Sequence, residues 1–190
     1  TINSGCFWST SSDISSDGKY FVVGTARGAN CGGSSGRDGY IHFFDRDNSS
    51  NNWKYQHGDY VYSVSISADG KYMVSAGRSG HLILFSRDSS TPLWSYNHGS
   101  SSEYRGVDIS ADGKYIVGVG SNAGIQVFNM NSSTPFFDTS DNYDYVSISA
   151  NGEYFVVADT TGSYSSNGKV SFYKTLDIDG ESDKLWTDTI

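Results

Sequence analysis

The sequence has little of several features that mark common classes of protein. Its 13 lysines and arginines are outnumbered by 21 acidic residues, which gives a formal net charge of −8. Nucleic acids and anionic membrane surfaces are bound through basic surfaces, so we expect neither as a partner. No apolar run approaches the roughly 20 residues of a membrane-spanning helix, and helical periodicity never extends beyond about two turns. We therefore expect no membrane insertion and no helical domain.

Glycine and aromatic residues are abundant, whereas proline is scarce. The chain has 22 glycines, 14 tyrosines and 2 prolines, and aromatic residues make up 15% of it. Aromatic and β-branched residues between clusters of glycine, serine and asparagine are typical of short strands joined by tight turns. The composition predicts an all-β fold.

One pattern occurs four times along the chain: Ile-Ser, two further residues, Gly, Lys or Glu, and then Tyr. The four copies begin at Ile14, Ile66, Ile109 and Ile148. Their glycines, Gly18, Gly70, Gly113 and Gly152, are 52, 43 and 39 residues apart. Repeats of about 40–45 residues in an all-β sequence predict the blades of a β-propeller.

Each repeat divides into four predicted strands. The first ends at the Ile-Ser pair, and the Asp-Gly or Asn-Gly that follows predicts a two-residue hairpin turn. The second strand begins at the tyrosine. The third and fourth are aromatic segments such as Tyr40–Phe44 and Trp53–Tyr55. We predict a single domain, residues 1–190, of four four-stranded blades at about 5–58, 59–99, 100–140 and 141–190.

The ends of such a row of blades need covering. Four blades can close into a ring alone, whereas an open half-ring would expose the outer faces of the first and last blades to water. A homodimer that joins the last blade of each chain to the first blade of the other would complete an eight-bladed ring. We predict this homodimer, with a closed four-blade ring or further blades of a longer chain as the alternatives.

The repeat resembles the WD-repeat-like and quinoprotein-like propeller families over nearly the whole chain. The Ser-Ala-Asp-Gly-Lys-Tyr segment ending at Tyr72 is typical of the WD-like group. The segment from Phe85 to Tyr96 is similar to the end of a quinoprotein-type blade. No Trp-Asp pair closes a third strand, and Pro92 and Pro135 stand where such blades normally have glycine. The resemblance implies a propeller and leaves its activity open.

A group of aromatic residues and one arginine recurs just before or within the innermost predicted strands. Their positions predict a rim around one mouth of the central channel, where rigid amphipathic rings would bind a protein or stack on a sugar. Packing between blades is the alternative role for the tyrosines. The predicted binding rim consists of Trp8, Tyr60, Tyr62, Tyr104, Arg105, Tyr143 and Tyr145.

The two cysteines, Cys6 and Cys31, are predicted to form a disulfide. Cys6 lies at the entry to the first strand. Cys31 lies in an insertion between Arg27 and Asp38, which should emerge on the same face of the blade. Two free thiols are the alternative.

A short acidic segment resembles part of a calcium-binding loop. Asp177, Asp179 and Asp183 flank a glycine turn, and carboxylates spaced in this way can converge on one cation. The alternative is a solvated turn. The four histidines do not cluster, and His57 and His98 are expected to be repeated turn residues. Calcium is therefore the one cofactor to consider.

The sequence favours a non-catalytic binding or scaffolding module. We find no pattern for a nucleophile–base pair, a zinc site or a phosphate loop, and so predict no catalytic residues. The acidic, Ser/Asn-rich composition favours an extracellular or cell-surface location, and the absence of an initiator methionine favours a processed or excised piece. The alternatives are a fragment of a propeller enzyme, such as a quinoprotein-like dehydrogenase or a lactonase, and a structural component of the cell surface.

Overall fold

The computed structural model describes residues 7–27, 38–159, 168–175 and 183–189. Within these ranges the chain forms four antiparallel sheets, each made of four strands that lie side by side in chain order. The prediction of an all-β propeller with four four-stranded blades is confirmed. The strands are β1 (Phe7–Ile14), β2 (Tyr20–Arg27), β3 (Asp38–Asp45) and β4 (Trp53–Gln56); β5 (Val61–Ile66), β6 (Tyr72–Gly77), β7 (His81–Ser86) and β8 (Pro92–Asn97); β9 (Glu103–Ile109), β10 (Tyr115–Ser121), β11 (Gly124–Asn129) and β12 (Phe137–Thr139); and β13 (Tyr145–Ile148), β14 (Tyr154–Asp159), β15 (Lys169–Lys174) and β16 (Asp183–Thr189).

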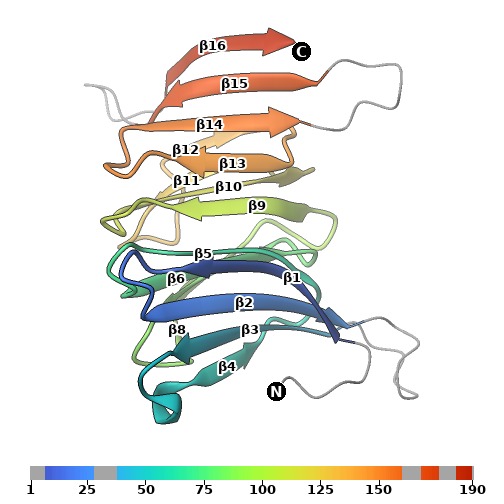
Figure 1. Cartoon of the computed structure of the whole chain (residues 1–190). Coiled ribbons are helices and arrows are strands. Elements are labelled where there is room, and N and C mark those ends of the chain that lie inside the picture. The colour runs from blue at the N-terminus through green and yellow to red at the C-terminus, as the bar shows by residue number, and fades with distance from the viewer. Residues whose placement is uncertain (1–6, 28–37, 160–167, 176–182, 190) are drawn as a thin grey trace.

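The four blades form an open arc. Consecutive blades contact one another mainly through their first strands, β1, β5, β9 and β13, while the fourth strands diverge. The first and last blades lie at opposite ends of the molecule, with β4 and β16 farthest apart (Figure 1). Within the described residues, the first and last blades therefore do not meet to close a four-blade ring.

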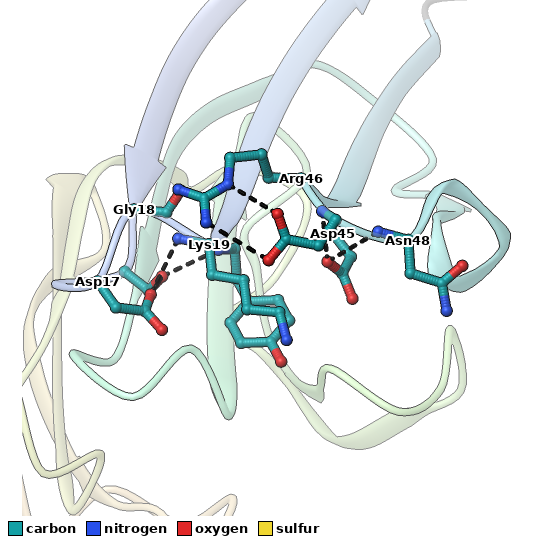
Figure 2. A network of polar contacts seen from close by, with 9 residues as sticks. Asp17, Gly18, Lys19, Asp45, Arg46 and Asn48 are labelled. Atoms are coloured by element: carbon teal, nitrogen blue, oxygen red, sulfur yellow. Dashed lines mark hydrogen bonds and ion pairs between the residues drawn. The ribbon is translucent and has the colours of Figure 1, made fainter.

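The turn between the first two strands of each blade is longer than the sequence predicts. Ser15 N–H donates to the Tyr20 carbonyl at 2.8 Å, which leaves four residues in the loop instead of two. Only Gly18 among them has a positive φ, 67°. The Asp17 carboxylate accepts from the Ser15 hydroxyl at 2.6 Å. It also accepts from Lys19 N–H at 2.9 Å (Figure 2). The Ser15 hydroxyl is the main cause of the lowered pKa of Asp17. The prediction of a two-residue hairpin turn was wrong, because hydrogen bonds of these side chains stabilise the longer loop.

The hydrophobic core lies between the blades. Alternate residues of each strand point to opposite faces of a sheet, so each inner blade contributes to two apolar layers. In the second blade, Met73 and Phe85 pack toward the first blade, while Val74 and Leu84 pack toward the third; all four are fully buried. A third layer joins the third and fourth blades. Among the residues that the structure describes, one face of the first blade and one face of the last therefore have no neighbouring blade.

Candidate functional site

Three of the innermost strands carry a bulge at the same place. Thr10 in β1, Tyr62 in β5 and Arg105 in β9 are each skipped in the pairing with the second strand of their blade. An extra residue in one strand is left outside the ladder, and its side chain is redirected. The repeat thus places Tyr62 and Arg105 at equivalent positions in neighbouring blades. The Arg105 guanidinium lies over the Tyr62 ring, 5.5 Å from its centroid.

The side chains of Trp8, Tyr60, Tyr62 and Arg105 form a continuous series of contacts across three blades, here called the rim row. Ring centroids are 5.8 Å apart between Trp8 and Tyr60 and 6.4 Å apart between Tyr60 and Tyr62. The Trp8 side chain is 49% exposed, and the Arg105 side chain is 46% exposed. The rim row therefore presents aromatic and guanidinium surfaces to solvent.

Glu103 holds the arginines of this region in place. Its carboxylate forms ion pairs with Arg78 at 3.1 Å and with Arg105 at 3.0 Å. Arg78 in turn lies over the ring of Tyr60, at 5.7 Å. Partial burial, and after it the Glu103 carboxylate, raises the pKa of Tyr62. Like any tyrosine hydroxyl, that of Tyr62 is protonated at neutral pH and can donate a hydrogen bond to a ligand.

A hollow of about 300 Å³ lies at the end of the rim row. It is lined by Tyr62, Arg105, Asp144 and Tyr145. Tyr145 is 62% exposed, more than any other large apolar or aromatic side chain that the structure describes. The hollow combines aromatic faces with charges of both signs, which suits one or two side chains of a protein ligand or a single sugar unit.

Two residues of the predicted rim are buried between blades. Tyr104 donates its hydroxyl hydrogen to Gln126 at 2.7 Å, and the hydroxyls of Tyr143 and Ser171 are 2.7 Å apart. Burial raises the pKa of Tyr104. These two tyrosines therefore pack between blades, which was the alternative role that the sequence allowed for them. They occupy the position of Val61, which points inward in its own repeat.

Sequence reasoning missed Arg78 and Glu103. Glu103 lies six residues before its repeat's isoleucine, as Trp8 and Tyr60 do in theirs, so aligning the repeats could have placed it on the rim. Arg78 follows the second strand and carries no such signal. Its part in the site depends on the path of the chain through the blade.

A second polar group, the channel belt, links the innermost strands. The Ser65 hydroxyl lies between two carboxylates, 3.0 Å from Asp13 and 2.8 Å from Asp108. Asp13 also accepts from Ile66 N–H, and Asp108 from Ile148 N–H, each at 2.9 Å. Burial raises the pKa of Asp108. Each of these carboxylates bonds the backbone of the next blade, so the belt holds neighbouring blades together.

Most of the other predicted site residues lie outside the described ranges. Cys6 and Cys31 both do, so the disulfide stays a prediction. Asp177 and Asp179 do as well, whereas Asp183 is the exposed first residue of β16. The calcium loop therefore also stays a prediction. Within the described ranges, no three His, Cys, Asp or Glu side chains gather into a group that could hold a metal ion. In the same ranges there is no helix with the length and apolar character needed to span a membrane.

The repeated sheets define a class, the β-propeller, and part of the chain is similar to a WD repeat. The family model "WD domain, G-beta repeat" matches residues 51–86. This segment runs from the fourth strand of the first blade to the third strand of the second. No curated protein matches the chain significantly.

Solved structures resemble the chain in fold. Hydrazine synthase of Kuenenia stuttgartiensis matches with a TM-score of 0.66 and 18% identity, over 96% of this chain and 49% of that one. A chain of a mitotic checkpoint complex matches with a TM-score of 0.73 and 17% identity, over 96% of this chain and 53% of that one. The chain thus spans about half the length of each of these two matched chains. The similarity of residues 51–86 to a WD repeat suggests a binding or scaffolding module.

Proposed function

We propose that the chain is an extracellular, non-catalytic module that binds a protein through the rim row. The observation that carries the proposal is the rim row itself, where rigid aromatic rings and a stacked guanidinium from three blades are open to solvent. Protein interfaces are enriched in Tyr, Trp and Arg, and these residues supply most of the binding energy.

The rim row is organised before a partner arrives. Glu103 pairs with both Arg78 and Arg105, and each guanidinium lies over a tyrosine ring. Side chains that are already held lose little conformational entropy on binding. This preorganisation supports a binding surface that meets its partner without rearrangement.

The extracellular location is supported by composition. The chain is acidic, with a pI of about 4.7, and serine and asparagine are frequent in its turns. A predicted disulfide between Cys6 and Cys31 would fit an oxidising compartment. Mass spectrometry of non-reduced protein tests that pairing directly, because two free thiols would remove this support.

The test of the binding surface uses an array of extracellular proteins and a glycan array. The wild-type chain is compared with Tyr62→Ala/Arg105→Ala and with Leu93→Ala, a control at a side chain that is 50% exposed on β8. We expect wild type and control to bind the same protein spots, and the double variant to lose at least tenfold in affinity. Equal binding by all three, or rim-dependent binding to glycans only, would contradict a protein-binding rim.

A further inference from the structure

The blades are joined by tryptophans on their fourth strands. The indole N–H of Trp53 donates to the backbone carbonyl of Arg87 in the second blade, at 2.8 Å. In the same way Trp94 donates to the carbonyl of Met130 in the third blade, at 2.7 Å. Both acceptors lie two residues beyond a buried phenylalanine of the third strand. This bond is a repeated device for holding one blade against the next.

Trp186 is the equivalent residue of the last blade. It pairs with Phe172 across β15 and β16, as Trp53 pairs with Phe43 across β3 and β4. The Trp186 side chain is nevertheless 50% exposed, and no acceptor within the described ranges takes its indole N–H. The last blade thus presents the donor half of an interblade contact.

A tyrosine and a glycine make the second repeated contact. The ring of Tyr20 lies so close to Gly70 of the next blade that a Cβ there would be 2.3 Å from it, and the same contact recurs at the two later junctions. In the last blade, Tyr154 is 37% exposed. In the first blade, a Cβ on Gly18 would have only the Arg46 guanidinium within 4 Å, at 3.8 Å. Within the described ranges, the Tyr154 ring of the last blade therefore has no glycine of a following blade beneath it, and Gly18 of the first blade has no tyrosine ring over it.

The turns form the third contact, a chain of backbone hydrogen bonds. Ser16 N–H donates to Ala68, Ala68 N–H to Ala111, and Ala111 N–H to Ala150, at 2.9, 3.0 and 3.0 Å. Within the described part of the chain, the N–H of Ala150 has no acceptor and the carbonyl of Ser16 has no donor. The series therefore ends with a free donor on the last blade and begins with a free acceptor on the first.

The outer face of the first blade carries the matching acceptors. Arg46 and Arg87 are equivalent, because each N–H bonds the carbonyl of the lysine after the Asp-Gly turn, at 2.9 Å. Arg46 lies beside Gly18 at this face (Figure 2). Phe44 stands where Phe85 stands in the second blade, but it is only partly buried, whereas Phe85 is fully buried beneath the neighbouring tryptophan. The first blade therefore has the three groups that contact a neighbouring blade at the interior junctions. They are the Arg46 carbonyl, the Phe44 ring and Gly18.

We propose that the last blade of this chain docks on the first blade of a second copy, and that two such contacts close an eight-bladed ring. The tail face, defined by Tyr154, Phe172 and Trp186, meets the head face, defined by Gly18, Phe44 and Arg46. Trp186 of one copy donates to the Arg46 carbonyl of the other. Because the two faces differ, two-fold symmetry produces both contacts at once.

The channel belt supports a second copy as the occupant. The residue before the repeated isoleucine alternates between Asp and Ser along the chain: Asp13, Ser65, Asp108 and Ser147. Ser65 lies between the carboxylates of the blades on either side. In the proposed ring, Ser147 meets Asp13 of the second copy, and the alternation continues without a break. This inference is independent of the proposed protein-binding function.

The first test is the mass of the 190-residue chain by light scattering over a dilution series. We expect twice the sequence mass of 20.6 kDa at micromolar concentration. A monomer at all concentrations would overturn the proposal and leave the two faces for further blades of a longer chain. A series of higher masses would show open head-to-tail assembly and would overturn the closed ring.

Variants of each face separate this ring from other dimers. Trp186→Asp removes the tail contact, Phe44→Asp removes the head contact, and Leu93→Asp is the control at an exposed apolar side chain away from both faces. We expect the first two to be monomers and the control to stay dimeric. Mixing the tail and head variants should restore a dimer, because one wild-type tail then meets one wild-type head. A dimer broken by only one of the two variants, or no recovery on mixing, would overturn the head-to-tail arrangement.

Discussion

Trp94 and Trp186 occupy the same place in two blades and have different surroundings. Trp94 donates its indole hydrogen to the next blade, whereas Trp186 lies half exposed at the end of the arc. Their strands and cross-strand pairing are equivalent. The comparison shows that a repeat determines the blade locally, while burial of its faces depends on the neighbouring blade. Paired substitutions at interior and end positions test this difference when they are measured on dilute, monomeric protein.

The largest effect is expected at the buried phenylalanine. Phe85→Ala removes a fully buried ring that contacts Trp53 and Tyr55, at 5.4 and 5.0 Å between centroids. We expect a loss of about 3–5 kcal/mol in the free energy of unfolding. Phe44→Ala, the matched change at the end face, should lose less than about half as much. Denaturant unfolding measures both, and equal losses would contradict the distinction between interior and end.

The glycines of the turns come next. Gly70→Ala and Gly18→Ala place a side chain at the same positive φ of 67°, which costs about 1–2 kcal/mol at either position. Only Gly70 lies beneath a tyrosine of the neighbouring blade, so its variant should lose about 1–3 kcal/mol more through overpacking. Thermal or denaturant unfolding of the two variants decides this, and the prediction fails if Gly18→Ala is the more damaging change.

Lowering the pH should reduce the stability of the fold through the buried side chain of His57. Burial, and after it the nearby His81, lowers the pKa of His57 from 6.5 to about 4. Between about pH 4 and pH 6.5 the unfolded chain therefore binds a proton that the folded chain does not bind. Stability from this group is complete above pH 6.5 and declines as the pH falls toward 4, by up to about 3 kcal/mol. His57→Gln should flatten this decline. His42→Gln, at a half-buried side chain on the outer face of the first blade, should change it less, and the opposite order would contradict the assignment.

The smallest effect concerns the indole hydrogen bonds. Trp94→Phe leaves the Met130 carbonyl without its donor, and we expect a loss of about 1–2 kcal/mol. Trp186→Phe should change the stability of the monomer by less than about 0.5 kcal/mol, because its indole is open to solvent. Unfolding curves at the same protein concentration give both values. A similar loss for the two variants would mean that Trp186 already has a partner within the chain.

Much of the fold could be predicted because the repeat is local. The four Ile-Ser segments and their glycines placed the strands, and residues such as Tyr72 and Phe85 marked second and third strands at the right positions. The turn was wrong because its length depends on the Ser15 and Asp17 side chains. Their hydrogen bonds are invisible to a rule based on the Asp-Gly pair alone.

The candidate site was less predictable, because it depends on which way a side chain points. Tyr62 and Tyr104 are one position apart when the repeats are aligned, yet one is on the rim and the other is buried. The side chain at the bulge, Tyr62 or Arg105, lies on the rim, whereas the side chain one position earlier, Val61 or Tyr104, is buried. Sequence alone does not give this register. Arg78 joins the site from the turn that follows β6, so only the arrangement of the blade in space reveals it.

The contact of Trp186 with a second copy is tested most directly by hydrogen exchange of the indole N–H groups of the four tryptophans, followed by NMR. Trp53 and Trp94 should exchange slowly at every protein concentration, and the exposed Trp8 should exchange quickly. Trp186 should exchange quickly in dilute protein and become as protected as Trp94 where the ring forms. If Trp186 exchanges as fast as Trp8 in concentrated protein whose mass is that of a dimer, its contact with a second copy is contradicted.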